Sequence, residues 1–214
     1  MIRTLLASLA LTLAAGPAFP EPPATRAEAL AALENPQTER RAEAVVWVAN
    51  HGRMDDTALL VKRLHDESLF VRGYAERGLW LLWGRSGDGD IDGVMARGVE
   101  AMEAGNHAAA VTLFTEVIQR RPSFAEGWNK RATAYYLTGD YRKSLADCAE
   151  VIKRNPQHFG ALSGYGQVYF QLEDYENAIL WWRRALAVNP NMAGVEISLR
   201  TVERLLQDKR GRST

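Results

Sequence analysis

The residues best suited to bind a cation lie at positions 88–93, which read D-G-D-I-D-G. Alternating carboxylates with a glycine at the sixth position open an EF-hand loop, whose oxygens bind Ca²⁺. The twelfth position of such a loop carries a bidentate Glu, but here it is Val99. Carboxylates at the start of a helix also stabilise its N-terminus without any metal. The sequence therefore favours a capping linker, with Asp88, Asp90 and Asp92 as the alternative calcium ligands.

Histidine and cysteine are too sparse to suggest a metal site or a catalytic centre. The four histidines, at positions 51, 65, 107 and 158, form no i, i+4 pair and have no cysteine neighbour, so a zinc site is not indicated. Cys148 is the only cysteine, which excludes an intramolecular disulfide. The chain also lacks a Gly-rich phosphate loop and a G-x-S-x-G elbow. We expect no catalytic residue, no metal and no cofactor, and hence a protein that is not an enzyme.

The charge balance argues against a nucleic-acid partner. The chain has 26 Lys and Arg against 26 Asp and Glu, so no overall field attracts polyanions. A basic stripe interleaved with aromatic residues, which is typical of nucleic-acid binding, is absent. The short basic tail at 209–214 is interpreted as a solvated chain end.

The first residues have the pattern of a secretory signal peptide. Arg3 precedes an uncharged, mostly apolar run over 4–16, and small residues follow, which indicates cleavage after Ala18. The run is shorter than the roughly 20 apolar residues of a membrane-spanning helix, and a transit peptide, the alternative, would be richer in Arg and Ser. We predict a signal peptide at 1–18, a Pro-rich linker at 19–24, and a soluble periplasmic or secreted protein.

A repeat of 34 residues organises the second half of the chain. Four columns keep this register: Pro122, Pro156 and Pro190; Asn106, Asp140 and Asp174; Phe114, Cys148 and Trp182; Gly98, Ala132 and Gly166. Glycine followed by a capping side chain ends one helix and begins the next, and proline closes the second helix. Each unit is therefore a helical hairpin whose apolar face only the next repeat can bury. The same register makes Cys148 a small buried residue.

These columns resemble the tetratricopeptide repeat (TPR) family. The middle copy matches best, through Trp128, Ala132, Tyr135, Gly139, Tyr141 and Pro156. The resemblance implies an all-α, right-handed helical-repeat solenoid with TPR 1 at 91–124, TPR 2 at 125–158, TPR 3 at 159–192 and a capping helix at 193–208. In the third copy, Glu173 stands where glycine is usual. Segments 125–133 and 158–164 are also similar to uncharacterised exported bacterial repeat proteins.

Residues 25–85 resemble HEAT-type helical pairs. Asp66 followed by Val71-Arg72, Ala75 and Leu79 carries the resemblance, and a weaker copy lies 31 residues earlier. A capping box over Thr25 to Glu28 is expected to begin the first helix, and Asp56 is expected to cap the third. Because the connection at 86–90 is short, we expect the two arrays to form one continuous curved solenoid.

Three tryptophans, Trp47, Trp80 and Trp83, fall on the apolar faces of these N-terminal helices. Aromatic side chains bury the most area, so core packing is the first interpretation. Stacking on a sugar or another small ligand is the alternative. That alternative loses its basis if all three prove fully buried.

The first helix of each repeat carries the candidate binding site. In the TPR family these helices line a concave groove, so the resemblance implies a peptide-binding site at Met95, Val99, Met102, Glu103, Asn129, Thr133, Tyr136, Leu137, Ser163, Gln167, Phe170 and Gln171, extended by Ile197 and Thr201. Met102, Tyr136 and Phe170 recur at the repeat spacing and are expected to form an apolar ridge, unless they pack between helices. The family's Lys, Asn and Arg clamp for a terminal carboxylate is missing, because its positions hold Met95, Val99, Gly160 and Gly164.

The favoured function is a non-catalytic scaffold or adaptor in the bacterial envelope, which binds a partner protein or peptide in this groove. Chaperone C-terminal tails are poor partners for a groove without the clamp. The alternative is an enzyme accessory, or a protein that binds a small molecule or sugar with its Trp-rich N-terminal half.

Overall fold

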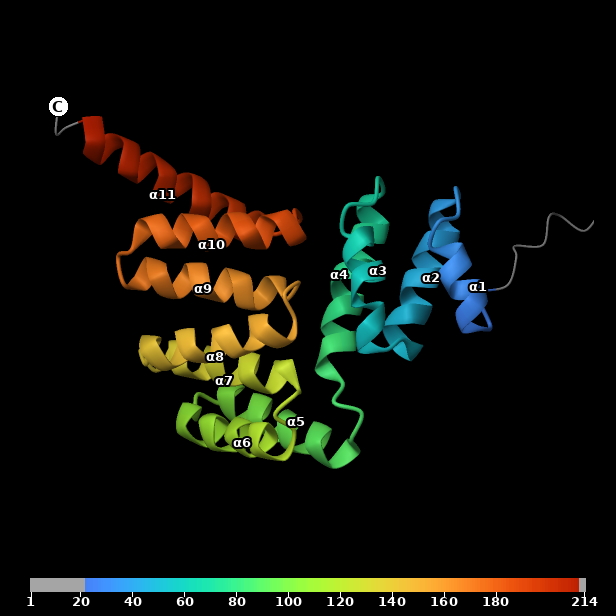
Figure 1. Cartoon of the computed structure of the whole chain (residues 1–214), viewed down its shortest axis with the longest axis horizontal. Coiled ribbons are helices and arrows are strands. Elements are labelled where there is room, and N and C mark those ends of the chain that lie inside the picture. The colour runs from blue at the N-terminus through green and yellow to red at the C-terminus, as the bar shows by residue number, and fades with distance from the viewer. Residues whose placement is uncertain (1–21, 212–214) are drawn as a thin grey trace, which may run out of the picture.

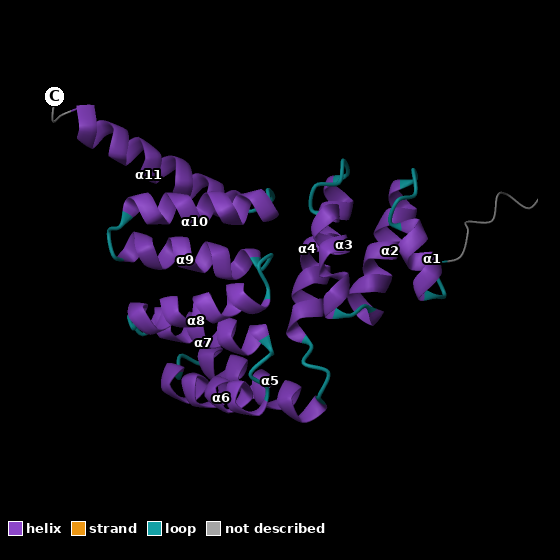
Figure 2. Ribbon diagram, viewed as in Figure 1, coloured by secondary structure: helices purple, strands orange, loops and turns teal. Residues whose placement is uncertain are grey.

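The computed structural model describes residues 22–211, together with the side chains of residues 22–208. This part of the chain folds into eleven α-helices and one short 3₁₀ turn and contains no strand, which confirms the all-α class (Figures 1 and 2). The predicted signal peptide, most of the Pro-rich linker and the side chains of the basic tail lie outside the described residues. None of the described helices is both long and apolar enough to span a bilayer.

The first four helices form the N-terminal unit, and their bounds are α1 (Arg26–Ala32), α2 (Thr38–His51), α3 (Thr57–Arg63) and α4 (Leu69–Gly84), with the 3₁₀ turn at Met54–Asp56. Thr25 caps α1 by accepting a hydrogen bond from the Glu28 amide, as the capping box predicts. Asp56 occupies the N-cap position of α3, as expected, but its side chain makes no capping bond to that helix. Its carboxylate accepts from the Arg53 amide and pairs with Arg26 instead.

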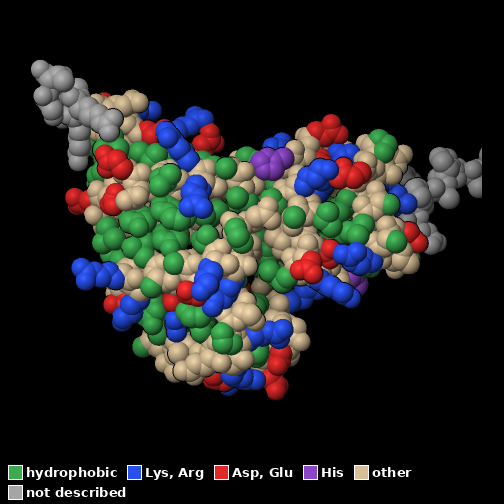
Figure 3. All heavy atoms as spheres, viewed as in Figure 1, with side chains coloured by type: hydrophobic (Ala, Val, Ile, Leu, Met, Phe, Trp, Pro, Cys, Tyr) green, Lys and Arg blue, Asp and Glu red, His purple; other side chains and the backbone are tan. Residues whose placement is uncertain are grey.

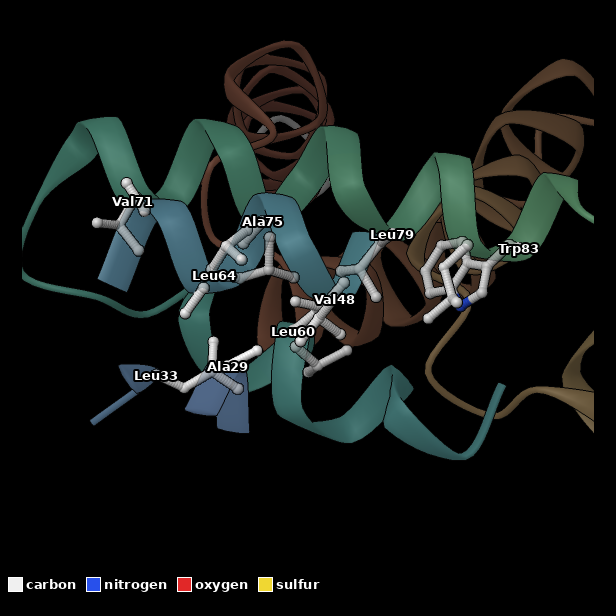
Figure 4. Packing of buried hydrophobic residues seen from close by; sticks show 14 of the residues in the cluster. Ala29, Leu33, Val48, Leu60, Leu64, Val71, Ala75, Leu79 and Trp83 are labelled. Carbon is white, nitrogen blue, oxygen red and sulfur yellow. The ribbon is translucent and has the colours of Figure 1, made fainter. Parts of the chain in front are cut away.

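A contiguous apolar core joins the helices of this unit. Figure 4 shows Ala29, Val48, Leu60 and Leu79, one from each of the four helices, in the same core, and each of these residues is almost fully buried. At the edge of the core, Arg41 of α2 forms a two-pronged hydrogen bond with Asp66, at 2.8 Å for each nitrogen. Both side chains are buried, so charge as well as apolar area links the two helical pairs.

Seven further helices form the repeat stack: α5 (Gly89–Glu103), α6 (His107–Arg120), α7 (Ala125–Leu137), α8 (Tyr141–Arg154), α9 (Phe159–Gln171), α10 (Tyr175–Val188) and α11 (Ala193–Gly211). The hairpin turns require left-handed backbone, with φ of 76° at Gly105 and 79° at Gly139. The third turn adopts the same conformation at Glu173, with φ of 58°, although side chains disfavour it.

The small-residue column packs against the large-residue column within each hairpin. A Cβ added to Gly98 would lie 2.4 Å from the Phe114 ring, and one added to Gly166 would lie 2.3 Å from the Trp182 ring. In the middle repeat the facing residue is the smaller Cys148, and alanine takes the place of glycine at Ala132. The middle repeat thus pairs a larger residue in the small column with a smaller residue in the facing column.

The two arrays do not form the continuous solenoid expected from the short connection. Figure 1 shows α4 running across the ends of the repeat helices, beside the loops that join one repeat to the next. Trp80 and Trp83 of α4 pack on His158 and Phe159, and Asn191 donates to the Leu64 carbonyl at 2.8 Å. Through this joint α4 packs on the start of α9 rather than continuing the stack beyond α5.

Candidate functional site

The second and third repeats enclose a cavity of about 260 Å³ between α7, α8 and α9. Five of the residues predicted from the repeat register line it: Asn129, Thr133, Tyr136, Ser163 and Gln167. The remaining walls come from Ala132, Ser144, Cys148, Gly160, Gly164 and Val168. The structure thus brings the central part of the predicted groove together around one hollow.

Small residues create the space for this cavity. Gly160 and Gly164 leave the α9 wall without side chains, and the Ser144 hydroxyl is occupied by a hydrogen bond to the Ala132 carbonyl at 2.8 Å. Cys148 is buried in the floor, and burial raises the pKa of its thiol to about 12. A thiol with so high a pKa is not a nucleophile near neutral pH, so the cavity floor is chemically inert.

Uncharged hydrogen-bonding groups stand around the cavity mouth. The Tyr136 hydroxyl oxygen accepts from the Nε2 atoms of Gln167 and Gln171, each at 3.2 Å. This arrangement leaves the tyrosine O–H as a donor and both glutamine carbonyls as acceptors. Thr133 adds a hydroxyl on the next turn of α7, bonded to the Asn129 carbonyl at 3.0 Å. These groups match the donors and acceptors of a peptide backbone.

The other predicted residues are placed elsewhere. Met95 is buried in the core of the first repeat, and Val99 and Met102 pack against the same cluster. Phe170 lies against the Trp182 ring, with 5.8 Å between ring centroids. Of the expected ridge, only Tyr136 lines the cavity. Five predicted residues that do not line the cavity are exposed, namely Glu103, Leu137, Gln171, Ile197 and Thr201.

A buried polar network borders this site and was missed by the sequence reasoning. His158 is fully buried, accepts the Ala161 amide at Nδ1 and lies 3.0 Å from Glu126 through Nε2. Because Nδ1 is an acceptor, Nε2 carries the proton and donates to the carboxylate. Burial opposes ionisation of Glu126, but the bond from His158 and the nearby Lys130 charge outweigh it and lower the pKa of Glu126.

The network connects the cavity to the N-terminal unit. The Trp83 ring stacks on the His158 ring with centroids 4.4 Å apart. Trp80 covers Gly160, where an added Cβ would approach the indole to 2.4 Å. The repeat register is the one sequence signal that could have predicted a role for His158. It places this residue directly before α9, at the position that caps the helix.

Of the three calcium candidates, Asp88 caps a helix, and Asp90 and Asp92 lie in its first turn. Asp88 is the N-cap of α5 and accepts from the amides of Asp90 and Ile91. Asp92 lies in the first helical turn, as the favoured capping-linker interpretation requires, and accepts from the Ser86 amide at 2.9 Å. Over the described residues, no three His, Cys, Asp or Glu side chains converge as metal ligands.

The three tryptophans have different environments. Trp83 is buried and donates to the Thr57 hydroxyl at 3.2 Å, and Trp80 is half-buried in the joint. Trp47 instead lines an open cleft of about 510 Å³ on the N-terminal unit. The alternative of a ligand at this half of the molecule therefore rests on Trp47 alone.

Comparison with known proteins identifies the repeats. The family model described as tetratricopeptide repeat matches residues 95–151 and 130–193. Residues 95–193 are tetratricopeptide repeats. The TPR stack thus comprises the repeats that the 34-residue period predicts, and the HEAT resemblance of the N-terminal unit stays a prediction.

Relatives share this TPR content over part of their length. A TPR repeat-containing protein of Rhizobium etli is 36% identical over 110 residues, which cover 51% of this chain and 54% of the relative. Hsp70-Hsp90 organizing protein 1 of Glycine max is 27% identical over 100 residues, covering 47% of this chain and 18% of that protein. The matched region is thus about half, or less, of these relatives.

Solved structures agree on the fold. The first TPR of Spaghetti (RPAP3), bound to an HSP90 peptide, covers 55% of this chain and 93% of its own, with a TM-score of 0.53 and 22% identity. The Sgt2 TPR domain from Aspergillus fumigatus covers 56% of this chain and 82% of its own, with a TM-score of 0.54 and 22% identity. At these identities the likeness shows the helical-repeat fold.

Proposed function

We propose that this protein is a non-catalytic adaptor that binds a segment of a partner protein on the cavity face of the TPR stack. The observation that carries the proposal is the hollow between α7 and α9, with Tyr136 and Gln167 at its mouth. Its polar groups are uncharged and follow two helices, which suits the peptide groups of a bound chain. The RPAP3 structure, similar in fold, holds a peptide, which supports the same ligand class here.

The bound segment should be poor in acidic residues. No Lys or Arg belongs to the residues that line the cavity within the described chain. The positions of the family's carboxylate clamp hold Gly160 and Gly164 in the cavity wall, and Met95 and Val99 in the first repeat. A terminal carboxylate would find no cation here, so we propose an internal, neutral segment as the ligand.

Apolar surface on the stack supports a protein partner. Figure 3 shows hydrophobic side chains gathered over the middle of the stack, with charged side chains scattered around them. Leu137, Leu172 and Leu180 are each about half exposed, at 49%, 45% and 51%. Exposed apolar area of this kind is typical of a surface that contacts other proteins.

The adaptor is proposed to work in the bacterial envelope. The charge, apolar run and small residues of the first 18 positions support export. Fractionation of cells expressing the tagged protein tests this, and N-terminal sequencing of the exported form should begin at Phe19. A cytoplasmic protein that retains Met1 would contradict the location without affecting the binding proposal.

Photo-crosslinking in the host tests the binding face. A photoreactive residue at Thr133, on the cavity, should capture a partner, whereas one at Ala187, exposed on α10, should not. Ser163→Trp fills the cavity and should abolish capture from Thr133, while the matched Ala187→Trp should leave it unchanged. Equal capture from both positions, in variants that melt like the wild type, would refute the proposed face.

A further inference from the structure

The N-terminal unit carries a second concave surface, separate from the TPR cavity. It is the Trp47 cleft, of about 510 Å³, lined by Pro22, Pro23, Glu39, Ala42, Glu43, Val46, Trp47, Asn50, His51, Phe70 and Tyr74. The Val46 and Phe70 side chains are 38% and 59% exposed. An open apolar surface on helices is a candidate binding site, and its lining indicates which class of ligand it would bind.

Two aromatic pairs form the walls of the Trp47 cleft. Trp47 and His51, one turn apart on α2, lie with their ring centroids 4.8 Å apart. Phe70 and Tyr74, one turn apart on α4, meet edge to face at 4.7 Å. These contacts hold the rings in place, so that little side-chain entropy is lost when a ligand binds between them.

Two prolines of this chain already pack in the Trp47 cleft, which indicates that proline fits its surface. Pro22 and Pro23 form part of the cleft wall, beside the aromatic side chains of α2 and α4. Proline rings pack well on aromatic faces, and a polyproline II segment is already extended before it binds. The lining also offers polar groups that polyproline II carbonyls need. Trp47 Nε1, Asn50 Nδ2 and the Tyr74 hydroxyl donate to no acceptor within residues 22–208.

The charge around the Trp47 cleft adds a second requirement. The lining within the described chain holds two acidic side chains, Glu39 and Glu43, one turn apart on α2, and no Lys or Arg. Arg77, outside the lining, lies over the Tyr74 ring at 5.0 Å. Glu43 is paired with Arg40 at 2.6 Å, whereas Glu39 is exposed. A basic residue next to the prolines of a ligand would complement this rim.

We propose that the Trp47 cleft binds a proline-rich, basic segment of a partner protein in polyproline II conformation. Proline rings would lie between the Trp47 and Tyr74 rings, and the backbone carbonyls would accept from the indole and phenol donors. Glu39 would select an Arg or Lys beside the prolines. This proposal does not depend on the peptide-binding role of the TPR stack.

Titration of the purified protein with synthetic peptides, followed by calorimetry, tests the proposal. The probe is a blocked peptide of about ten residues, rich in proline and flanked by arginines. Two controls keep its length: one replaces proline by alternating Gly and Ser, and one replaces arginine by glutamate. We expect each control to bind at least about tenfold more weakly than the probe.

Variants locate the site. Tyr74→Ala should weaken binding of the probe about tenfold or more, and Leu81→Ala, exposed on α4 but outside the lining, should not. Glu39→Lys lies on an exposed site and should reverse the preference between the arginine and glutamate peptides. Ser163→Trp in the TPR cavity should leave the titration unchanged.

Three results would overturn the proposal. Equal binding of the proline and Gly-Ser peptides would show that the cleft recognises the arginines of the peptide and not its prolines. Loss of binding in Ser163→Trp would place the peptide on the TPR stack. An unchanged peptide preference in Glu39→Lys would exclude the acidic rim as the selecting group.

Discussion

The N-terminal unit and the TPR stack reach the same kind of helical packing by different means. In the N-terminal unit, a buried charge pair between Arg41 and Asp66 links one helical pair to the next. In the stack, small residues lie under aromatic rings inside each hairpin, as Gly166 lies under Trp182. The Arg41–Asp66 pair makes the packing of the N-terminal unit depend on one ionic contact. In the stack, the packing of small residues on rings is repeated in each hairpin.

The comparison predicts that a single charge deletion harms the N-terminal unit more than the stack. Asp66→Ala removes the carboxylate from two buried arginines, Arg41 and Arg63, although Arg41 keeps its bonds to two carbonyls and to Glu67, and should lower the free energy of unfolding by ~3–5 kcal/mol. Asp147→Ala is the matched change in the stack. It removes the carboxylate from one arginine, Arg131, which is more exposed, so ~1–3 kcal/mol is expected. Equal losses in urea titrations of the two variants would break the comparison.

The contribution of Asp66 to stability should decrease at acid pH. Burial opposes ionisation of Asp66, but hydrogen bonds from Arg41 and the Ser68 amide, with the Arg41 and Arg63 charges, hold its pKa below the ordinary value of an aspartate. A carboxylate with a depressed folded-state pKa contributes stability above its unfolded pKa and loses it as the pH falls through the folded value. Melting temperature measured from pH 5 down to pH 2 should therefore fall less steeply in Asp66→Asn than in wild type. Parallel slopes would show that Asp66 is not the responsible group.

The sequence predicts the stack well because its signals are local and repeated. The 34-residue spacing places Gly105 and Gly139 at turns with positive φ, and it places Phe114 and Trp182 in slots facing glycine. The same register places Asp92 in the first turn of α5.

The relation between the two units could not be predicted. Trp80 and His158 lie far apart in the chain and share no repeat register, so no pattern brings them together. The groove shows the same limit: the repeat register names a helix face, but Met95 and Phe170 pack inward against neighbours whose shape only the structure supplies. The volume of the side chains on the adjacent helix decides which residues of the predicted face remain free to contact a ligand.

The joint between the units is expected to be the next most sensitive point. His158→Ala removes the cap of α9, the bond to Glu126 and the surface under Trp83, and should cost ~2–4 kcal/mol. His65→Ala is the control in the same joint. Its ring is exposed, with Nε2 3.2 Å from the Val188 carbonyl oxygen, and its loss should change stability by less than ~0.5 kcal/mol. A His158→Ala variant as stable as His65→Ala would show that the two units are only loosely docked.

Within the stack, the glycine column should be less tolerant than other helical glycines. Gly166→Ala forces a methyl group into the Trp182 indole and should destabilise by ~1–3 kcal/mol. At Gly164, on the same helix, an added Cβ would meet Cys148 at an ordinary 3.7 Å. Gly164→Ala should therefore be neutral or stabilising, by up to ~1 kcal/mol, because alanine favours the helix. Thermal melts of the pair check this directly, and equal melting temperatures would contradict the tight packing of the column.

The smallest effect concerns the one turn that departs from the repeat. Glu173 holds a left-handed φ of 58° that glycine occupies in the other two hairpins. Replacing it by glycine relieves the steric strain of a side chain in that region, so Glu173→Gly should stabilise the protein by about 1 kcal/mol. The gain is limited because glycine also adds entropy to the unfolded chain.

The reverse change at the equivalent turn separates strain from any lost contact of the glutamate. Gly139→Ala introduces the same strain into the second hairpin, where nothing lies within 4 Å of an added Cβ, and should destabilise by about 1 kcal/mol. Opposite shifts of similar size in the two variants would show that backbone conformation alone sets the cost of each turn. If Glu173→Gly destabilised the protein instead, the glutamate side chain would have to make a stabilising contact that outweighs the backbone strain. The third repeat would then depend on a specific side-chain interaction, as the N-terminal unit depends on the Arg41–Asp66 pair.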